Sequence, residues 1–212
     1  MNRVWVIVLV LALTACSRGA GQTRAFEVAE SIDRVELRGA ATHVEVSAGP
    51  GPVSVRETAR KFPATSHRVT GTTLVLTDPG CPKPTGCEVT FTIRVPLGAA
   101  VAIHTDVGNV RVRDLTGDLT IETAVGDIDA TALRGKNVLA HTDTGSVRLR
   151  FSGVPDRVDA RVAVGEVDIR LPRAAKYAVD CTGYAEVSVD RDELSPHRIT
   201  ARSPLGISIR PA

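Results

Sequence analysis

The sequence predicts an all-β protein: a single-domain parallel β-solenoid, with about 18–20 residues and two strands per turn, behind an irregular N-terminal β cap. Three observations predict this fold. Glycines recur at near-regular spacing, the flanking residues alternate in a fixed phase relative to them, and no long helical pattern occurs. Consecutive glycines are 18, 19, 20, 18 and 23 residues apart, as their residue numbers give. They are Gly108, Gly126, Gly145, Gly165, Gly183 and Gly206.

The fixed phase is visible at positions seven, five and three before each glycine, and two and four after it. Side chains alternate between the two faces of a strand, so equivalent positions should point inward in every copy. These positions are therefore the predicted interior columns. The fifth copy fits only with a slip of one residue, which places Tyr177, Val179 and Cys181 inward, and Ala185 and Val187 are its inward positions after Gly183. The last copy slips likewise to Ile207 and Ile209. In the regular copies the columns hold Val101, Ile103, Thr105, Val110 and Val112; Leu119, Ile121, Thr123, Ile128 and Ala130; Val138, Ala140, Thr142, Val147 and Leu149; Val158, Ala160, Val162, Val167 and Ile169.

The glycine marks one corner of each turn, where a positive φ or close stacking favours a residue without Cβ. A second corner is marked by Gly117, Gly135 and Gly153. An antiparallel sandwich is the alternative fold, because it also has many short strands separated by turns. Sandwich strands need not repeat in register, whereas these do, so the solenoid is favoured.

The N-terminus reads as an export signal. Residues 1–15 contain the apolar run Val4 to Leu13, which is too short to be a permanent membrane span. The segment Leu13-Thr14-Ala15-Cys16 resembles the bacterial lipobox, which implies that Cys16 is lipidated after cleavage. Residues 16–25 would then be a flexible tether. An ordinary secretory signal with a chance cysteine is the alternative. The predicted location is extracytoplasmic, lipid-anchored to the bacterial cell membrane.

Composition limits the classes of partner. The 212 residues include 26 Lys and Arg and 24 Asp and Glu. Arg3 is the one charged residue in 1–15, so loss of this segment would change the balance by a single positive charge. Basic residues are dispersed and aromatic residues are scarce, so nucleic acid is excluded as a partner. The length suits one elongated domain. The sequence does not indicate an oligomeric state.

Residues 26–100 show strand pairs without the clean glycine period, and residues 101–212 form the predicted repeats. We interpret the first region as an N-terminal cap and first turns, because an exposed solenoid end would offer its ladder to other chains. Its strand pairs are Val35/Leu37, Val44/Val46, Val53/Val55, Leu74/Leu76 and Val89/Phe91/Ile93/Val95.

Within this region, Cys81 and Cys87 bracket a loop rich in proline and glycine. Export favours a disulfide between them. A metal site is the alternative, but no second cysteine pair accompanies it. Cys181 occupies an inward strand position and is predicted to be a small buried apolar residue.

The search for chemistry finds no motif for a catalytic, metal or cofactor site, and none of these is predicted. His104, Glu122, His141 and Arg161 precede successive glycines by four residues and should stack on one outer face. The two histidines would lie about 9.6 Å apart, two strand spacings, which is too far for them to share a metal ion. We interpret this column as a polar ladder.

Two further outward columns carry charge. Three residues after each glycine the sequence predicts the alternating column Arg111, Asp129, Arg148, Asp168 and Glu186. Two residues further on, it predicts the more basic column Arg113, Thr131, Arg150, Arg170 and Ser188. The arginines of this second column are candidates for binding an anionic partner, a wall polymer or lipid headgroup, with a solvated face as the alternative.

The repeat between Gly183 and Gly206 is longer than the others. It contains the acidic segment Asp190, Asp192 and Glu193, interrupted by Arg191. A protruding ligand-binding loop and a solvated insertion both fit this pattern.

The repeated T-x-x-G-x-[VI] unit resembles the bacterial putative-adhesin domains of unknown function, which are lipoprotein or membrane-linked parallel β-solenoids. The resemblance covers roughly residues 35–209. Departures lie late, where 161–165 lacks the threonine and 181–183 is one residue short. The resemblance is carried by Thr92-Ile93-Arg94-Val95-Pro96, Thr105-Asp106-Val107-Gly108-Asn109-Val110, Thr123-Ala124-Val125-Gly126-Asp127-Ile128 and Thr142-Asp143-Thr144-Gly145-Ser146-Val147.

The resemblance implies surface display. With the absence of catalytic motifs, it leads to the hypothesis of a membrane-anchored, non-catalytic binding or scaffolding lipoprotein whose partner is a cell-wall polymer or an envelope protein. A surface adhesin for an external ligand is one alternative. A carbohydrate-active enzyme on a parallel β-helix is another, and it would need paired carboxylates converging in a groove.

Overall fold

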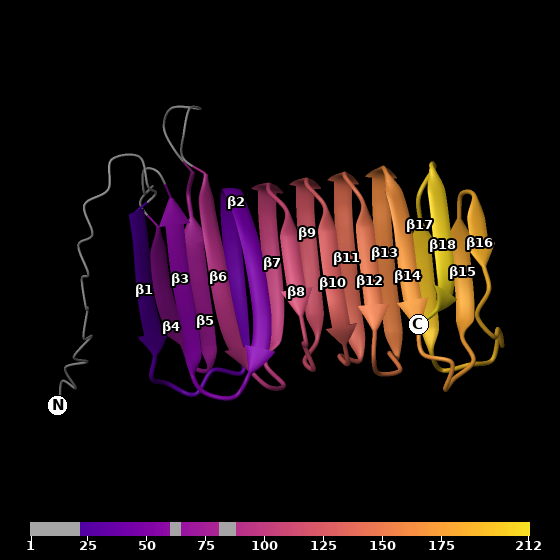
Figure 1. Ribbon diagram of the computed structural model, residues 1–212, viewed down its shortest axis with the longest axis horizontal. Coiled ribbons are helices and arrows are strands. Elements are labelled where there is room, and N and C mark those ends of the chain that lie inside the picture. Colours follow the sequence, from indigo (N-terminus) through magenta and orange to yellow (C-terminus); the bar gives the residue numbers. More distant parts are fainter. Residues whose placement is uncertain (1–21, 60–64, 81–87) are drawn as a thin grey trace.

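The computed structural model describes residues 22–59, 65–80 and 88–212, which form two β-sheets facing each other along one elongated axis (Figure 1). The strands are β1 (Gln22–Val28), β2 (Arg34–Gly49), β3 (Val53–Ala59), β4 (Ser66–Thr70), β5 (Thr73–Asp78), β6 (Val89–Pro96), β7 (Ala100–Val107), β8 (Val110–Arg113), β9 (Leu119–Val125), β10 (Ile128–Leu133), β11 (Asn137–Thr144), β12 (Val147–Phe151), β13 (Arg157–Val164), β14 (Glu166–Leu171), β15 (Ala178–Thr182), β16 (Ala185–Val187), β17 (Arg198–Arg202) and β18 (Gly206–Pro211). The described residues contain no helix.

Each regular turn contributes one strand to each sheet, and equivalent strands pair in parallel. Sheet B runs β7–β9–β11–β13, and sheet A runs β8–β10–β12–β14. In sheet B, His104 is the register partner of Glu122, which is the partner of His141. The predicted parallel solenoid with two strands per turn is therefore confirmed, and the sandwich alternative is wrong.

The core lies between the two sheets and includes the predicted interior columns of the regular copies, together with Leu115, Leu133, Phe151 and Leu171, which the repeat pattern does not predict. Val101, Ile121, Ala140 and Val158 of sheet B are almost fully buried, as are the sheet A columns that begin at Val110. The strands alternate between buried and solvent-facing residues, so each sheet has one dry and one wet face. Burial of these columns supplies the main drive for folding, and the outer faces remain free for contacts.

The glycine corner requires glycine because successive turns touch through their backbones. A Cβ built on Gly126 would lie 2.0 Å from the carbonyl oxygen of Gly108, and one on Gly145 would lie 2.1 Å from that of Gly126. The φ of Gly126 is also +154°, a conformation that other residues rarely adopt. The same backbone contact recurs at Gly108, Gly165 and Gly183, whereas a Cβ on Gly206 would meet only Glu166 Cγ at 3.8 Å, so the spacing reflects one steric requirement at five of the six glycines.

In one copy the threonine of the T-x-x-G unit bonds to a glycine of the preceding turn. Thr142 is fully buried, and its hydroxyl donates to the carbonyl oxygen of Gly126 at 2.9 Å. The hydroxyl of Ser203 likewise donates to the carbonyl oxygen of Gly165 at 2.7 Å. These bonds satisfy carbonyl groups that the tight turn would otherwise leave buried without a partner.

The N-terminal strands add antiparallel pairs to the solenoid. In sheet A, β3 pairs antiparallel with both β1 and β6, and in sheet B, β4 pairs antiparallel with β5. The long strand β2 crosses from one sheet to the other, pairing with β5 and β7 in sheet B and with β6 and β8 in sheet A. It therefore forms a complete turn and joins the antiparallel strands to the regular repeats.

The last turns do not follow sequence order. Strands β17 and β18 pair with β13 and β14 on one side and with β15 and β16 on the other. The C-terminal pair thus lies inside the stack and β15–β16 form its end, as Figure 1 shows. Tyr177 is fully buried as predicted, but Val179 and Cys181 are only half-buried and Ala185 is exposed. The prediction that these three residues are interior is corrected because their strands have a neighbour on only one side.

Candidate functional site

The outer face of sheet A carries an uninterrupted row of three arginines. Arg150 of β12 is the register partner of Arg170 of β14, which is the partner of Arg210 of β18. We call these three residues the arginine row. Parallel strands lie about 4.8 Å apart, so the three guanidinium groups leave the sheet on adjacent strands.

One carboxylate balances the arginine row only in part. Asp168 Oδ1 accepts from Arg210 Nη2 at 3.4 Å, and Asp168 Oδ2 lies 3.8 Å from Arg170 Nε. Both arginine side chains remain more than 40% exposed. Asp168 therefore serves two cations, while no ion pair is found for Arg150 among the described residues. The row keeps an excess of positive charge that faces solvent.

The structure corrects the predicted basic column at both ends. Arg113 pairs with Thr131 as predicted, but β10 and β12 change register between Ala130 and Leu133, so the arginine row begins only at Arg150. The bulge places Thr131 and Ala132 against one residue of β12, with Ala132 at a φ of +54°.

At the other end Arg210, not Ser188, follows Arg170. The insertion of β18 causes this replacement, and no local sequence pattern could have indicated it.

The alternating charge column lies on the same face. Arg111, Asp129 and Arg148 are register partners in order, with Asp168 next, as predicted. Two members differ from the prediction: Glu45 of β2 precedes Arg111, with its Oε1 3.4 Å from Arg111 Nη1, and Ser208 replaces Glu186 beside Asp168. Glu186 lies one strand further out, opposite Ser208.

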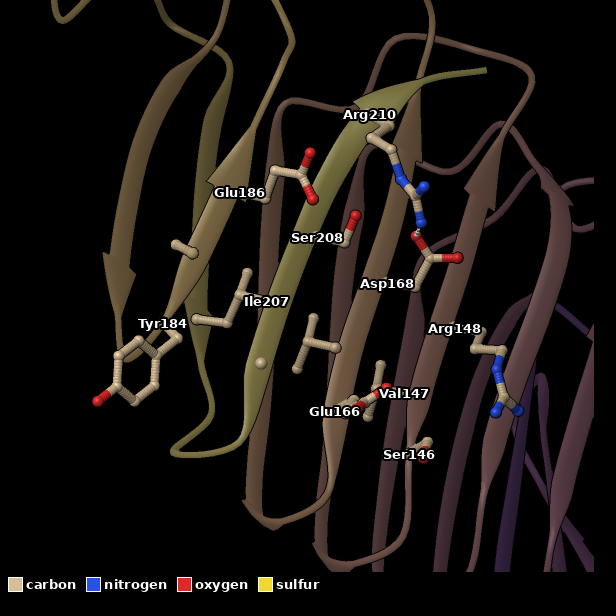
Figure 2. A pocket seen from close by; sticks show the side chains of 13 residues that line it. Ser146, Val147, Arg148, Glu166, Asp168, Tyr184, Glu186, Ile207, Ser208 and Arg210 are labelled. Atoms are coloured by element: carbon tan, nitrogen blue, oxygen red, sulfur yellow. Dashed lines mark hydrogen bonds and ion pairs between the residues drawn. The ribbon is translucent and has the colours of Figure 1, made fainter.

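Beside the arginine row, a shallow groove of about 590 Å³ opens over β18 (Figure 2). Its floor is made by small residues, Gly206 and Ser208, and its walls carry Glu166, Asp168 and Glu186. Ser208 Oγ is buried without a hydrogen-bond partner among the described residues. The groove is also lined by Arg148 and by Arg210 of the arginine row, so its lining carries both carboxylate and guanidinium groups.

The outer face of sheet B carries the predicted polar ladder. His104 Nδ1 lies 3.0 Å from Glu122 Oε2, and His141 Nε2 lies 3.5 Å from Asp143 Oδ1. Arg161 makes a two-pronged contact with Asp159 at 2.8 and 2.5 Å, which raises the pKa of its guanidinium. Within the described part of the chain, no cluster of three or more metal-ligating side chains is found.

The acidic segment lies in the connection between β16 and β17. Asp190, Asp192 and Glu193 are exposed. The backbone is held to the body of the protein, because Tyr177 N donates to Asp190 O at 2.9 Å and Asp192 N donates to Tyr177 O at 3.0 Å. Their role as ligand-facing residues stays a prediction.

The structure describes only one of the four cysteines, Cys181. Cys16, Cys81 and Cys87 lie outside the described residues, so lipidation and the disulfide stay predictions. Cys181 is a free, half-buried thiol. Burial, with a smaller contribution from Asp180, raises its pKa, which disfavours the reactive thiolate.

These features define a parallel β-solenoid with charged outer faces. The chain matches the Toastrack DUF4097 family over residues 27–203 and belongs to it. Two solved structures share the fold. A putative cell adhesion protein from Clostridium sporogenes has a TM-score of 0.55 at 11% identity, over 91% of this chain and 100% of that one. A putative adhesin from Bacteroides fragilis has a TM-score of 0.56 at 14% identity, over 91% of this chain and 98% of that one.

A comparison with curated proteins found no match. In the described ranges, no helix is long and apolar enough to cross a membrane. At the identities given above, the two solved structures establish the fold of this chain, and the names they carry describe those proteins.

Proposed function

We propose that the protein is a lipid-anchored, non-catalytic binding or scaffolding module of the bacterial cell envelope, and that the arginine row of sheet A contacts an anionic polymer. The observation that carries the proposal is the row itself: Arg150, Arg170 and Arg210 on three adjacent strands, with Asp168 as their nearby carboxylate.

The geometry favours a linear polyanion over a single anionic group. Successive arginines are spaced by about 4.8 Å along the solenoid axis, so an extended chain with regularly placed phosphates or carboxylates can engage all three. Arginine suits this role because its planar donors bind such oxygens in pairs. Asp168 can release Arg210 or Arg170 to the ligand at little cost, since exposed ion pairs contribute only about 0.2–1 kcal/mol.

The test uses inorganic polyphosphate as the probe polymer. The triple variant Arg150→Gln, Arg170→Gln, Arg210→Gln should lose most binding in a titration at low ionic strength. A matched control, Arg34→Gln, Arg38→Gln, Arg68→Gln, removes equal charge from sheet B strands and should retain binding. If both variants lose binding equally, net charge explains the binding and the arginine row is not the specific site. Binding to phosphatidylglycerol vesicles but not to polyphosphate would instead indicate a lipid headgroup.

The anchor is tested separately. Replacing Cys16 by serine should move the protein from the membrane fraction to the soluble fraction of the envelope, because lipidation requires the thiol. If the serine variant stays in the membrane fraction at the wild-type level, lipid at Cys16 is not the anchor, while the polymer-binding experiment is unaffected.

Adhesion to an external ligand is the second candidate, supported by the adhesion-related names of the two structural neighbours. The carbohydrate-active enzyme remains a third, because Glu166, Asp168 and Glu186 line one groove. Release of reducing sugar from wall polysaccharide, lost on Glu166→Gln and Glu186→Gln, would favour catalysis over binding.

A further inference from the structure

The glycine corner forms an exposed apolar ridge that neither the core nor the arginine row uses. The residues that directly precede the glycines pair with one another from turn to turn. Val107 is the register partner of Val125, Val125 of Thr144, and Thr144 of Val164. Leu205 and Tyr184 continue the same corner beside Gly206 and Gly183. In Figure 1 this corner is the upper edge, where β7, β9, β11 and β13 end.

Exposure along this ridge is high and concentrated. Of the seven large hydrophobic residues exposed in the described part of the chain, five lie here: Val107 at 52%, Val125 at 47%, Val164 at 56%, Leu205 at 61% and Tyr184 at 82%. Single exposed apolar residues are ordinary on a protein surface, but five of them along six adjacent turns of one corner, interrupted only by Thr144, mark an interaction site.

The ridge is not needed for the turn itself. Close approach at the corner is provided by the glycines, and Thr142 and Ser203 donate to the carbonyl groups of Gly126 and Gly165. Thr144 occupies the equivalent position in one turn without disturbing the register, so a polar residue is compatible with the fold. Packing therefore does not explain the apolar residues.

The flanks of the ridge are acidic. Asp106, Asp127, Asp143 and Glu166, one or two residues from the ridge positions, are all exposed. No Lys or Arg occurs from two residues before to one residue after the glycine in the four turns at Gly108, Gly126, Gly145 and Gly165. A second copy meeting this ridge with its own ridge would bring like charges together, and an anionic lipid surface would be repelled in the same way.

We infer that the glycine-corner ridge docks a cationic amphipathic segment of another protein. An α-helix lying along the solenoid axis presents apolar side chains three or four residues apart, about 5–6 Å, close to the strand spacing of about 4.8 Å. Lys and Arg beside that apolar stripe would meet the acidic flanks. This ridge differs from the arginine row in both charge and place, so the inference does not depend on the polyanion proposal.

The experiment measures binding of a synthetic 18-residue amphipathic helix, with a leucine stripe flanked by lysines, to the full chain by fluorescence anisotropy. The variant Val107→Ser, Val125→Ser, Val164→Ser should weaken binding by about tenfold or more. The variant Asp106→Asn, Asp127→Asn, Asp143→Asn should weaken it at low salt and flatten its salt dependence.

The control variant Leu97→Ser, Leu194→Ser removes two exposed apolar side chains outside the ridge and should bind like the wild type. Unchanged thermal unfolding of the serine variants shows that the ridge, and not folding, is altered. The inference is overturned if the peptide binds the ridge variants as well as the wild type. It is also overturned if the valine substitutions abolish self-association or binding to phosphatidylglycerol vesicles while peptide binding is unaffected.

Discussion

At the scale of single residues, the solenoid depends on the absence of a side chain at one corner. The carbonyl oxygen of Gly108 occupies the place where a Cβ on Gly126 would lie, and Gly145 meets Gly126 in the same way. The obstruction is backbone, which cannot move without shifting a whole strand. A corner glycine therefore has two separate reasons for its identity, the close contact and the positive φ.

Replacing Gly126 and Gly71 by alanine should compare a crowded corner glycine with an uncrowded turn glycine. Gly126→Ala combines a contact at 2.0 Å with an unfavourable φ and should lower the free energy of unfolding by about 3 kcal/mol or more. Gly71 has a φ of +60° and nothing within 4 Å of a built Cβ, so Gly71→Ala should cost only about 1 kcal/mol. Urea denaturation measures both, and equal losses would contradict the contact argument.

At the scale of strands, charges of alternating sign stack on the solvent-facing side of sheet A, and within this column Glu45 and Arg111 form the one ion pair that the structure shows among the described residues. Glu45, Arg111, Asp129, Arg148 and Asp168 alternate in sign over five adjacent strands. Exposed pairs of this kind contribute little individually. A slip of one residue would turn the buried columns outward, so hydrophobic burial fixes the register and the charges add to it.

Changing Asp129 to arginine should place three like charges in a row and lower the melting temperature at low salt. The expected loss is about 1 kcal/mol, with partial recovery as NaCl is raised, because salt screens exposed charges. The same charge change at Glu193, which lies outside the column, should have little effect. The double variant Arg111→Asp, Asp129→Arg should recover less than half of the loss, since Arg148 and Glu45 would each still face a like charge. A silent single variant in low salt would contradict the role of the column.

At the scale of the whole molecule, the order of turns along the axis differs from their order in the chain. The C-terminal strands β17 and β18 are covered on both sides, and β15–β16 close the stack. The final strand pair is thereby buried more completely than an end turn would be. Its insertion also completes the arginine row, because Arg210 takes the place beside Arg170.

Engineered cysteines should report this order directly. Asp168 and Ser208 are register partners on β14 and β18, with an expected separation of about 4.8 Å, which is within the range a disulfide can bridge. The pair Asp168→Cys, Ser208→Cys should therefore form a bond on mild oxidation, detectable by peptide mass mapping. The pair Asp168→Cys, Glu186→Cys spans two strand spacings and should remain reduced. A disulfide in the Asp168/Glu186 pair and none in the Asp168/Ser208 pair would show that the turns follow the order of the chain.

The sequence by itself determined the solenoid, the interior columns and much of the charged surface, because one glycine spacing and one alternation repeat at every turn. Arg150 beside Arg170, and Arg111, Asp129 and Arg148 in one column, follow from counting residues between glycines. Position within the repeat is a local property, and local sequence encodes it.

Only the tertiary structure decided the features that depend on which turns are neighbours. Glu45 beside Arg111, Arg210 beside Arg170 and Ser208 beside Asp168 all join strands from distant parts of the chain. The slipped phase of the last two repeats left the order of their strands open, since both contain apolar columns that can cover β13 and β14. Packing resolved it by burying Ile199, Ala201, Ile207 and Ile209 between two neighbours and leaving the half-apolar β15–β16 at the end.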